Sequence, residues 1–193
     1  AQGGLVQGAL SFNGQRCTAL KIFFVPKAHG DAFAKALAKK VEAKNVGLPW
    51  QTFGNDEDGS SSSSSLSYSS ITPLPGQKQL QRMKDLILDA VSKGAKIVNK
   101  DGGTVIGGPE STLMVPAVLY PVTPDMNIYH EEQFGPVVPI ATYESFDTFM
   151  KHGQTGIYGQ QVSLFLSNDQ TEAAVDAVDK FSSIFGKINI NSQ

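Results

Sequence analysis

Two hydrophobic periods alternate along this chain. Apolar runs of strand length occupy residues 20–25, 95–98, 113–119, 136–142, 161–166 and 184–190. Between them, apolar residues recur every three or four positions, which is the period of a helix with one buried face. These helical segments cover residues 4–10, 31–44, 77–93, 144–151 and 170–181. The alternation predicts an α/β fold, a three-layer sandwich in which a mostly parallel sheet carries helices on its faces.

Local signals place the ends of several of these elements. Asp31 is expected to cap the helix over 31–44, and Gly94 stands where the helix over 77–93 should stop. In that second helix the apolar face is formed by Leu80, Met83, Ile87, Ala90 and Val91. Asn168 and Asp169 are expected to cap the last helix. Pro116 interrupts the strand expected over 113–119, which predicts an edge position or a bulge there.

Residues 55–70 differ in composition from the rest of the chain. An acidic stretch over 55–59 leads into six consecutive serines, with almost no apolar side chain to bury. Such a segment does not offset the entropy cost of ordering its backbone, so we expect a flexible surface insertion. The flanking pieces are too short to fold separately, which predicts one domain over residues 1–193.

Composition and charge exclude several classes of protein. The 193 residues contain 16 Lys and Arg against 18 Asp and Glu, a formal net charge of −2, and no basic run that would favour nucleic acid. The apolar runs are far shorter than the roughly 20 residues that span a bilayer. No group of Cys and His has zinc-ligand spacing, so no metal site is expected. We expect a soluble, cytoplasmic protein.

Cys17 is the only cysteine in the chain and lies between a predicted helix and a predicted strand. A lone cysteine is often a small buried apolar residue. Here the adjacent Arg16 favours the thiolate, which is the nucleophilic form, and connecting segments commonly carry reactive groups. Cys17 is therefore a candidate nucleophile. His130 is an alternative activating base, whereas His29 and His152 carry no such signal.

Two stretches resemble motifs of one enzyme superfamily. Residues 14–19, with the sequence Gly-Gln-Arg-Cys-Thr-Ala, resemble the nucleophile motif of aldehyde dehydrogenases, in the arginine-containing form of the non-phosphorylating, NADP-dependent glyceraldehyde-3-phosphate branch. Residues 130–138 resemble the second main motif of that superfamily. Weaker matches occur over 158–165 and 186–191, and the resemblance covers nearly the whole chain except the serine-rich insertion.

The resemblance implies specific roles for residues in both motifs. Cys17 would be the catalytic nucleophile, Arg16 and Thr18 would bind substrate, and Glu132 and Phe134 would bind the nicotinamide cofactor. The implied reaction oxidises glyceraldehyde-3-phosphate to 3-phosphoglycerate through a thiohemiacetal and a thioester. The implied cofactor is NADP, or NAD, bound mainly by a domain that is not in this chain, and the full-length parent would be a homo-oligomer.

Two alternatives remain open at this point. The chain could be a non-catalytic interaction or regulatory module that keeps the fold and the motifs. It could also belong to a general aldehyde dehydrogenase for unphosphorylated substrates, because phosphate specificity rests on Arg16 alone.

Overall fold

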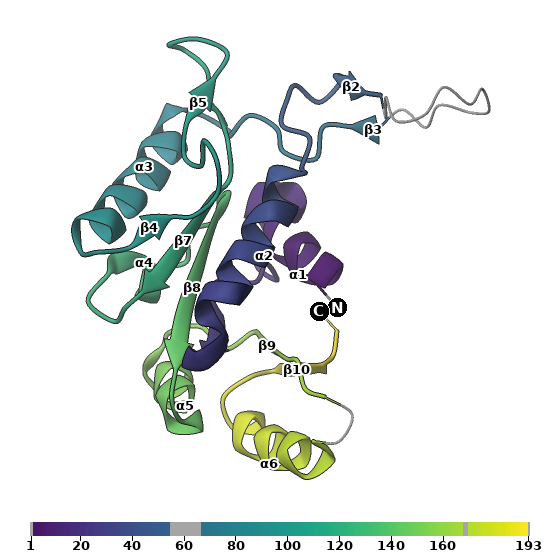
Figure 1. Cartoon of the computed structure of the whole chain (residues 1–193), viewed down its shortest axis with the longest axis vertical. Coiled ribbons are helices and arrows are strands. Elements are labelled where there is room, and N and C mark those ends of the chain that lie inside the picture. The colour runs from purple at the N-terminus through teal and green to yellow at the C-terminus, as the bar shows by residue number, and fades with distance from the viewer. Residues whose placement is uncertain (1, 55–66, 168–169, 193) are drawn as a thin grey trace, which may run out of the picture.

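The fold centres on a four-stranded sheet (Figure 1). The computed structural model describes residues 2–54, 67–167 and 170–192. The strand order is β1 (Phe23–Pro26), β8 (Val137–Tyr143), β7 (Ala117–Val122) and β4 (Lys96–Ile97). The first three strands are parallel and β4 is antiparallel to β7, which confirms the predicted mostly parallel sheet.

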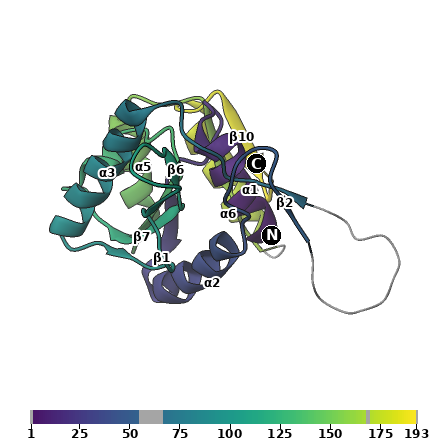
Figure 2. The same ribbon diagram turned by 90° about the horizontal axis from the view of Figure 1, so that it is seen from above.

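Helices cover both faces of this sheet. On one face lie α1 (Gln2–Leu10) and α2 (Gly30–Glu42), and on the other lie α3 (Gln77–Ser92) and the short α4 (Asn127–His130). Each face has its own apolar cluster, one built mainly with α1 and α2 and the other with α3 and α4. Figure 2 shows α3 and the α1–α2 pair on opposite sides of the strands. The three layers follow from helices that each bury one apolar stripe.

The last quarter of the chain has its own apolar cluster. Helix α5 (Phe146–Thr155) and α6 (Thr171–Ser182) bury Met150, Ala177 and Phe181 against each other and their surroundings. β9 (Gln161–Leu164) and β10 (Lys187–Ile190) pair in parallel as their own two-stranded sheet. This pair carries residues that reach the candidate site described below.

Short elements complete the description. β2 (Thr52–Phe53) pairs with β3 (Ser67–Tyr68), and β5 (Val105–Ile106) pairs with β6 (Leu113–Met114). Two 3₁₀ helices, η1 (Ser11–Gly14) and η2 (Lys27–His29), follow α1 and β1. The predicted flexible insertion lies outside the described residues over 55–66, and so does the predicted cap at 168–169. No helix in the described ranges is long and apolar enough to cross a bilayer.

The strands predicted over 113–119 and 20–25 differ from the structure in their details. The strand expected over 113–119 is two strands, β6 and β7, because Pro116 has no N–H to continue a ladder. β7 lies inside the sheet, so the expected edge position is wrong. The strand expected from residue 20 begins at Phe23, since the N–H of Leu20 donates to the Gly8 carbonyl instead.

Two helix details also differ. Helix α2 begins at Gly30, so Asp31 lies in its first turn and does not cap it; no side chain caps this end. Val91, expected on the buried face of α3, is 43% exposed, whereas Leu80, Met83, Ile87 and Ala90 are buried as predicted. Val91 lies near the end of the helix, where the buried stripe runs out.

Candidate active site

The Cys17 segment is a surface connection between η1 and β1. Cys17 itself is exposed, so the alternative of a small buried apolar residue is wrong. Its Sγ accepts a hydrogen bond from the side-chain amide of Gln160, with Nε2 at 3.6 Å. The sulfur is therefore open to solvent and held beside a polar group from a distant part of the chain.

The chain reverses immediately before this segment. Phe12, Asn13 and Gly14 have φ values of 53°, 60° and 70°, in the left-handed region that most L-residues avoid. The Asn13 side chain stabilises the reversal, because Nδ2 donates to the Thr72 carbonyl at 2.8 Å and Oδ1 accepts from the Thr72 N–H at 2.9 Å. Such backbone conformations persist where the surroundings fix them and are common near functional sites.

Gly14 brings the two sequence motifs together. A Cβ added at Gly14 would lie 2.6 Å from the carbonyl oxygen of Gly135, so only glycine permits this approach. A second link joins the same segments, since Gln133 Nε2 donates to the carbonyls of Lys21 at 3.0 Å and of Val137 at 2.8 Å. The cysteine segment and the loop over 131–136 thus form one structure, although more than 110 residues separate them in sequence.

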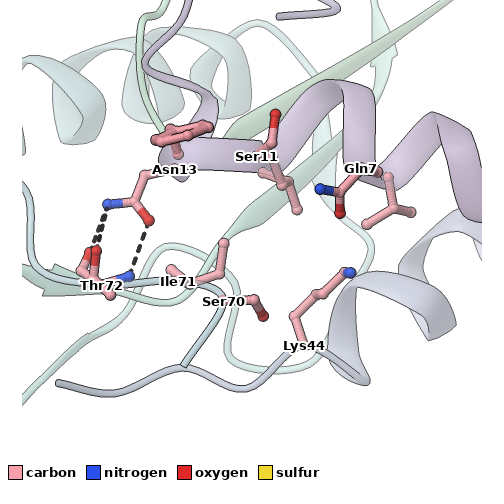
Figure 3. Close-up of a pocket in the computed structure, with 10 residues that line it drawn as sticks. Gln7, Ser11, Asn13, Lys44, Ser70, Ile71 and Thr72 are labelled. Carbon is pink, nitrogen blue, oxygen red and sulfur yellow. Dashed lines mark hydrogen bonds between the residues drawn. The ribbon is translucent and has the colours of Figure 1, made fainter. Parts of the chain in front are cut away.

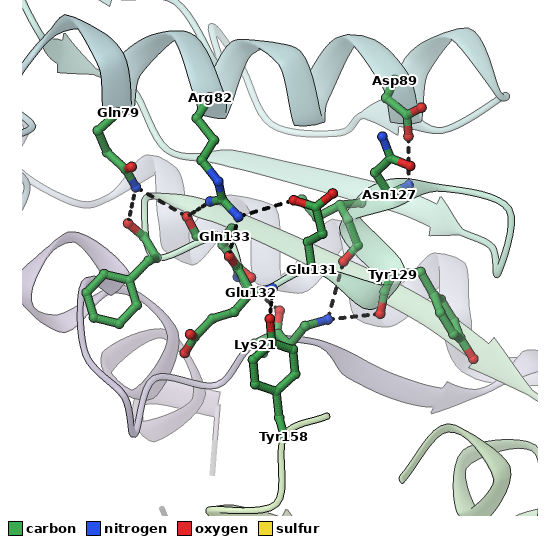
Figure 4. Close-up of polar contacts among 12 residues, drawn as sticks. Lys21, Gln79, Arg82, Asp89, Asn127, Tyr129, Glu131, Glu132, Gln133 and Tyr158 are labelled. Carbon is green, nitrogen blue, oxygen red and sulfur yellow. Dashed lines mark hydrogen bonds and ion pairs between the residues drawn. The ribbon is translucent and has the colours of Figure 1, made fainter. Parts of the chain in front are cut away.

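Helix α3 fixes the backbone of the second motif (Figure 4). The Arg82 guanidinium donates to the carbonyls of Gln133 and Glu132, each at 2.7 Å, and pairs with the Glu131 carboxylate at 3.3 Å. One turn earlier, Gln79 Nε2 donates to the Phe134 carbonyl at 2.6 Å. Three consecutive carbonyls of the loop therefore accept hydrogen bonds from one face of α3.

Lys21 ties the cysteine segment to α4. Its Nζ donates to the carbonyls of Tyr129 at 2.9 Å and Ile128 at 3.4 Å, at the end of α4 (Figure 4). Burial lowers the pKa of Lys21 to about 8, although the nearby carboxylates of Glu132 and Glu131 act in the opposite direction. A charged ammonium here is stabilised by the carbonyls it binds and by those carboxylates.

The main chains of Glu132 and Phe134 are fixed in the loop by hydrogen bonds, whereas their side chains do not take part in those bonds. The Glu132 N–H donates to the Tyr158 hydroxyl at 3.0 Å. Within the described ranges, no hydrogen bond or ion pair involves the Glu132 carboxylate. Phe134 has φ of 48° and its side chain is 38% exposed. This part of the loop therefore carries a carboxylate and an exposed aromatic ring two residues apart.

Comparison with protein families identifies the fold's relatives. The model of the aldehyde dehydrogenase family matches residues 1–193, the whole chain. This chain belongs to the aldehyde dehydrogenase family. That family is one of oxidoreductases.

Individual aldehyde dehydrogenase relatives agree with this assignment. The chain is 31% identical over 193 residues to the NADP-dependent glyceraldehyde-3-phosphate dehydrogenase of Nicotiana plumbaginifolia, covering 100% of this chain and 34% of that protein. It is 32% identical over 190 residues to the enzyme of the same name from Apium graveolens, covering 97% and 33%. The chain thus spans about a third of the length of these relatives.

Solved aldehyde dehydrogenase structures share the fold. The NADP-dependent glyceraldehyde-3-phosphate dehydrogenase of Bacillus halodurans C-125, complexed with NADP, superposes with a TM-score of 0.77 at 29% identity, covering all of this chain and 35% of that one. An aldehyde dehydrogenase from Brucella melitensis biovar abortus 2308 gives 0.78 at 26% identity, covering 99% and 35%.

The two other residues that the sequence assigned to this aldehyde dehydrogenase site flank Cys17. Arg16 is exposed and its guanidinium carbon lies 5.1 Å from the centre of the Phe12 ring, a cation–π contact. No carboxylate pairs with Arg16 in the part of the chain that the structure describes. The Thr18 carbonyl accepts a hydrogen bond from Gln161 Nε2 at 2.7 Å.

The histidines take no part in this arrangement. His130 Nε2 lies 2.6 Å from the Pro124 carbonyl, and no contact joins it to Cys17, so the structure gives no support to its role as the activating base. His29 is exposed in η2. His152 packs between the rings of Phe24 and Tyr129, at 4.9 and 4.8 Å between centres.

The surroundings of His152 disfavour its charged form. Burial lowers the pKa of His152 to about 4, and the positive charges of Lys21 and His130 add to that effect. His152 is thus a neutral packing residue over most of the pH range. Among the residues that the structure describes, no three His, Cys, Asp or Glu side chains cluster in a way that could hold a metal ion.

A cavity of about 330 Å³ lies beside the end of α1 and the Phe12–Asn13 turn (Figure 3). It is lined by Val6, Gln7, Leu10, Ser11, Phe12, Asn13, Lys44, Ser70, Ile71 and Thr72. Cys17 is not among these lining residues. The cavity and the cysteine are therefore separate features that share the Phe12–Asn13 turn.

Sequence reasoning missed several residues of this site. Lys21, Arg82, Tyr158 and Gln160 all contact the two motif segments from other elements. Tyr158 and Gln160 lie in a stretch that the sequence singled out as a weak match, which was a usable signal. Lys21 and Arg82 had none, because a basic residue on an amphipathic element is ordinarily solvated.

Proposed function

We propose that this chain forms the nucleophile-bearing part of an enzyme that oxidises an aldehyde, with Cys17 as the residue that bonds to the aldehyde carbon. The observation that carries this proposal is the joining of the exposed Cys17 segment to the loop over 131–136, through the close approach of Gly14 to Gly135 and the hydrogen bond from Gln133 to the Lys21 carbonyl. Membership of the aldehyde dehydrogenase family supports it.

The chemistry begins at the Cys17 sulfur. Its thiolate attacks the aldehyde carbon, so that an S–C bond forms and the carbonyl electron pair moves to oxygen as an oxyanion. In the described ranges no acceptor pairs with the Cys17 N–H, which leaves this donor for the oxyanion. One such donor contributes roughly 3–4 kcal/mol in comparable sites.

The nicotinamide cofactor is held in part by Glu132 and Phe134. When bound, NADP or NAD would supply the hydride acceptor, so that the thiohemiacetal carbon could lose a hydride and become the thioester carbonyl. The Glu132 carboxylate suits ribose hydroxyls because it has no competing partner within the described ranges, and Phe134 offers an exposed ring. The relatives named NADP-dependent support NADP as the cofactor. The remaining cofactor contacts, and the group that activates water, come from outside these 193 residues.

Glyceraldehyde-3-phosphate is the substrate that we propose, with 3-phosphoglycerate as product. Arg16 lies next to the nucleophile, is exposed, and contacts the Phe12 ring through its guanidinium group. An arginine fork matches phosphate oxygens bidentately. Thr18, on the other side of Cys17, would contact the same substrate. We further propose a cytoplasmic homo-oligomer for the whole protein.

Protection of Cys17 from alkylation tests this function. Because the chain has one cysteine, intact mass after iodoacetamide reports on Cys17 alone. Glyceraldehyde-3-phosphate is expected to slow the labelling, since a thiohemiacetal has no free thiolate. In Arg16→Gln, the concentration of glyceraldehyde-3-phosphate that gives the same protection should rise about tenfold. The protecting concentration of glyceraldehyde should not change. Lys35→Gln, on the exposed part of α2, is the charge-matched control.

Three results would contradict parts of the proposal. If neither aldehyde slows the labelling, Cys17 is not the residue that bonds to the aldehyde carbon. Equal protection by glyceraldehyde and glyceraldehyde-3-phosphate, with no effect of Arg16→Gln, would assign a general aldehyde dehydrogenase. The purified chain should form NADPH from glyceraldehyde-3-phosphate no faster than Cys17→Ser does, and robust turnover would mean that it needs no outside groups.

A further inference from the structure

Two consecutive glutamines from the β9 region are directed at the cysteine segment. Gln160 Nε2 donates to Cys17 Sγ at 3.6 Å, and Gln161 Nε2 donates to the Thr18 carbonyl at 2.7 Å. Each contact joins residues 143 positions apart. Because two neighbouring glutamines bond to two neighbouring residues, the distance between the start of β9 and the Cys17 sulfur is fixed better than a single hydrogen bond would fix it.

The backbone that carries these glutamines is itself held in place. Gln161 begins β9, where it pairs with Lys187 of β10, and the Gly159 carbonyl accepts the Gly186 N–H at 2.8 Å. A Cβ on Gly159 would lie 2.6 Å from the Ile184 carbonyl oxygen. Gln160 therefore projects from a short, tightly paired edge, so its amide is presented to the sulfur by the fold.

We propose that Gln160 is a catalytic residue whose side-chain amide donates a hydrogen bond to the Cys17 sulfur and stabilises negative charge there. The proposal rests on the proposed function, in which Cys17 is the nucleophile. The sulfur carries negative charge at two points of that reaction. The first is the thiolate before the S–C bond forms. The second is the thiolate released when water adds to the thioester, the C–S bond breaks and its electron pair returns to sulfur.

A neutral amide suits both points. Its N–H groups favour the thiolate over the thiol, as other donors to an anion do. It adds no charge beside Arg16, so the guanidinium remains available to an anionic substrate. Gln161 is a positioning residue in this arrangement, because it touches the main chain of Thr18 and not the sulfur.

The pH profile of Cys17 alkylation by iodoacetamide, measured without aldehyde or cofactor, tests the proposal. In this probe the sulfur displaces iodide, and only the thiolate reacts. For Gln160→Leu we expect the midpoint of the profile to move up by about half a pH unit and the rate at pH 7 to fall about threefold. Gln160→Glu keeps the shape of the side chain and adds a negative charge. For this variant we expect the midpoint to move up by about one pH unit and the rate at pH 7 to fall about tenfold.

The rate at high pH separates this role from a merely structural one. If the amide stabilises the thiolate, the plateau rate of either variant stays equal to that of the wild type or rises. If Gln160 only shapes access to the sulfur, the plateau changes and the midpoint does not. Gln154→Glu adds the same charge at an exposed position of α5 and should leave the profile unchanged.

The outcomes distinguish this inference from the proposed function. Profiles of both Gln160 variants that superimpose on the wild type would overturn the role of Gln160, even if aldehydes still protect Cys17. A shifted midpoint together with no aldehyde protection would keep the hydrogen bond and overturn the function. Because Gln160 is exposed, both variants are expected to fold, and an unchanged thermal midpoint would check this.

Discussion

Replacing Arg82 should release the second motif loop without unfolding the sheet. Arg82 donates two charge-assisted hydrogen bonds to the carbonyls of Glu132 and Gln133, each at 2.7 Å. Its ion pair with Glu131 contributes little, because the two side chains are 37% and 52% exposed. Two partly exposed bonds of this kind contribute about 2–3 kcal/mol together. For a chain of this size, that loss corresponds to a fall of about 4–12 °C in the melting temperature.

Urea unfolding and amide hydrogen exchange measure this effect on Arg82→Met. The free energy of unfolding should fall by about 2–3 kcal/mol, and the amides over 131–136 should exchange faster while those of β8 keep their protection. Lys78→Met removes the same charge from an exposed position of the same helix, where no contact is lost, and is the matched control. If Arg82→Met loses no more stability than Lys78→Met, the hydrogen bonds do not hold the loop.

Two further changes test other parts of the site. Gly14→Ala places a Cβ against the Gly135 carbonyl at a φ of 70°, and should lower the free energy of unfolding by about 3 kcal/mol in urea; a loss below about 1 kcal/mol would show that the two motif loops can separate freely. His152 has a folded-state pKa of about 4, below its unfolded value of about 6.5, so its contribution is present above pH 6.5 and is lost as the pH falls toward 4. His152→Phe should therefore flatten the acid side of the stability profile relative to wild type, whereas replacement of the exposed His29 by Asn should not; parallel profiles for His152→Phe and wild type would contradict the burial argument.

The sequence predicts most of the fold because the hydrophobic period reports which face of an element is buried. It predicts less well how an element pairs. Pro116 indicated an interruption, yet only the sheet order places β7 in the interior, between β8 and β4. The late start of β1 at Phe23 has the same origin, since the main chain of Leu20 and Lys21 bonds to other segments.

The candidate site likewise contains residues that the sequence predicts and residues that only the tertiary structure shows. Cys17 and Glu132 stand in motifs, so their positions could be predicted from the sequence together with a resemblance. Gln160 and Arg82 depend on packing between segments that are distant in sequence, and neither residue type signals a site by itself. Gly14 is intermediate: it stands in the first motif, but its contact with Gly135 follows only from the tertiary structure.

Carbon-13 NMR of an aldehyde labelled at its carbonyl carbon tests the central claim most directly, because it observes the atom that Cys17 is proposed to bond. With glyceraldehyde-3-phosphate and the purified chain, we predict a new resonance from a tetrahedral carbon bonded to sulfur. It should be lost in Cys17→Ser and retained in Lys78→Met. The same spectrum from wild type and Cys17→Ser would contradict the assignment of Cys17 as the nucleophile.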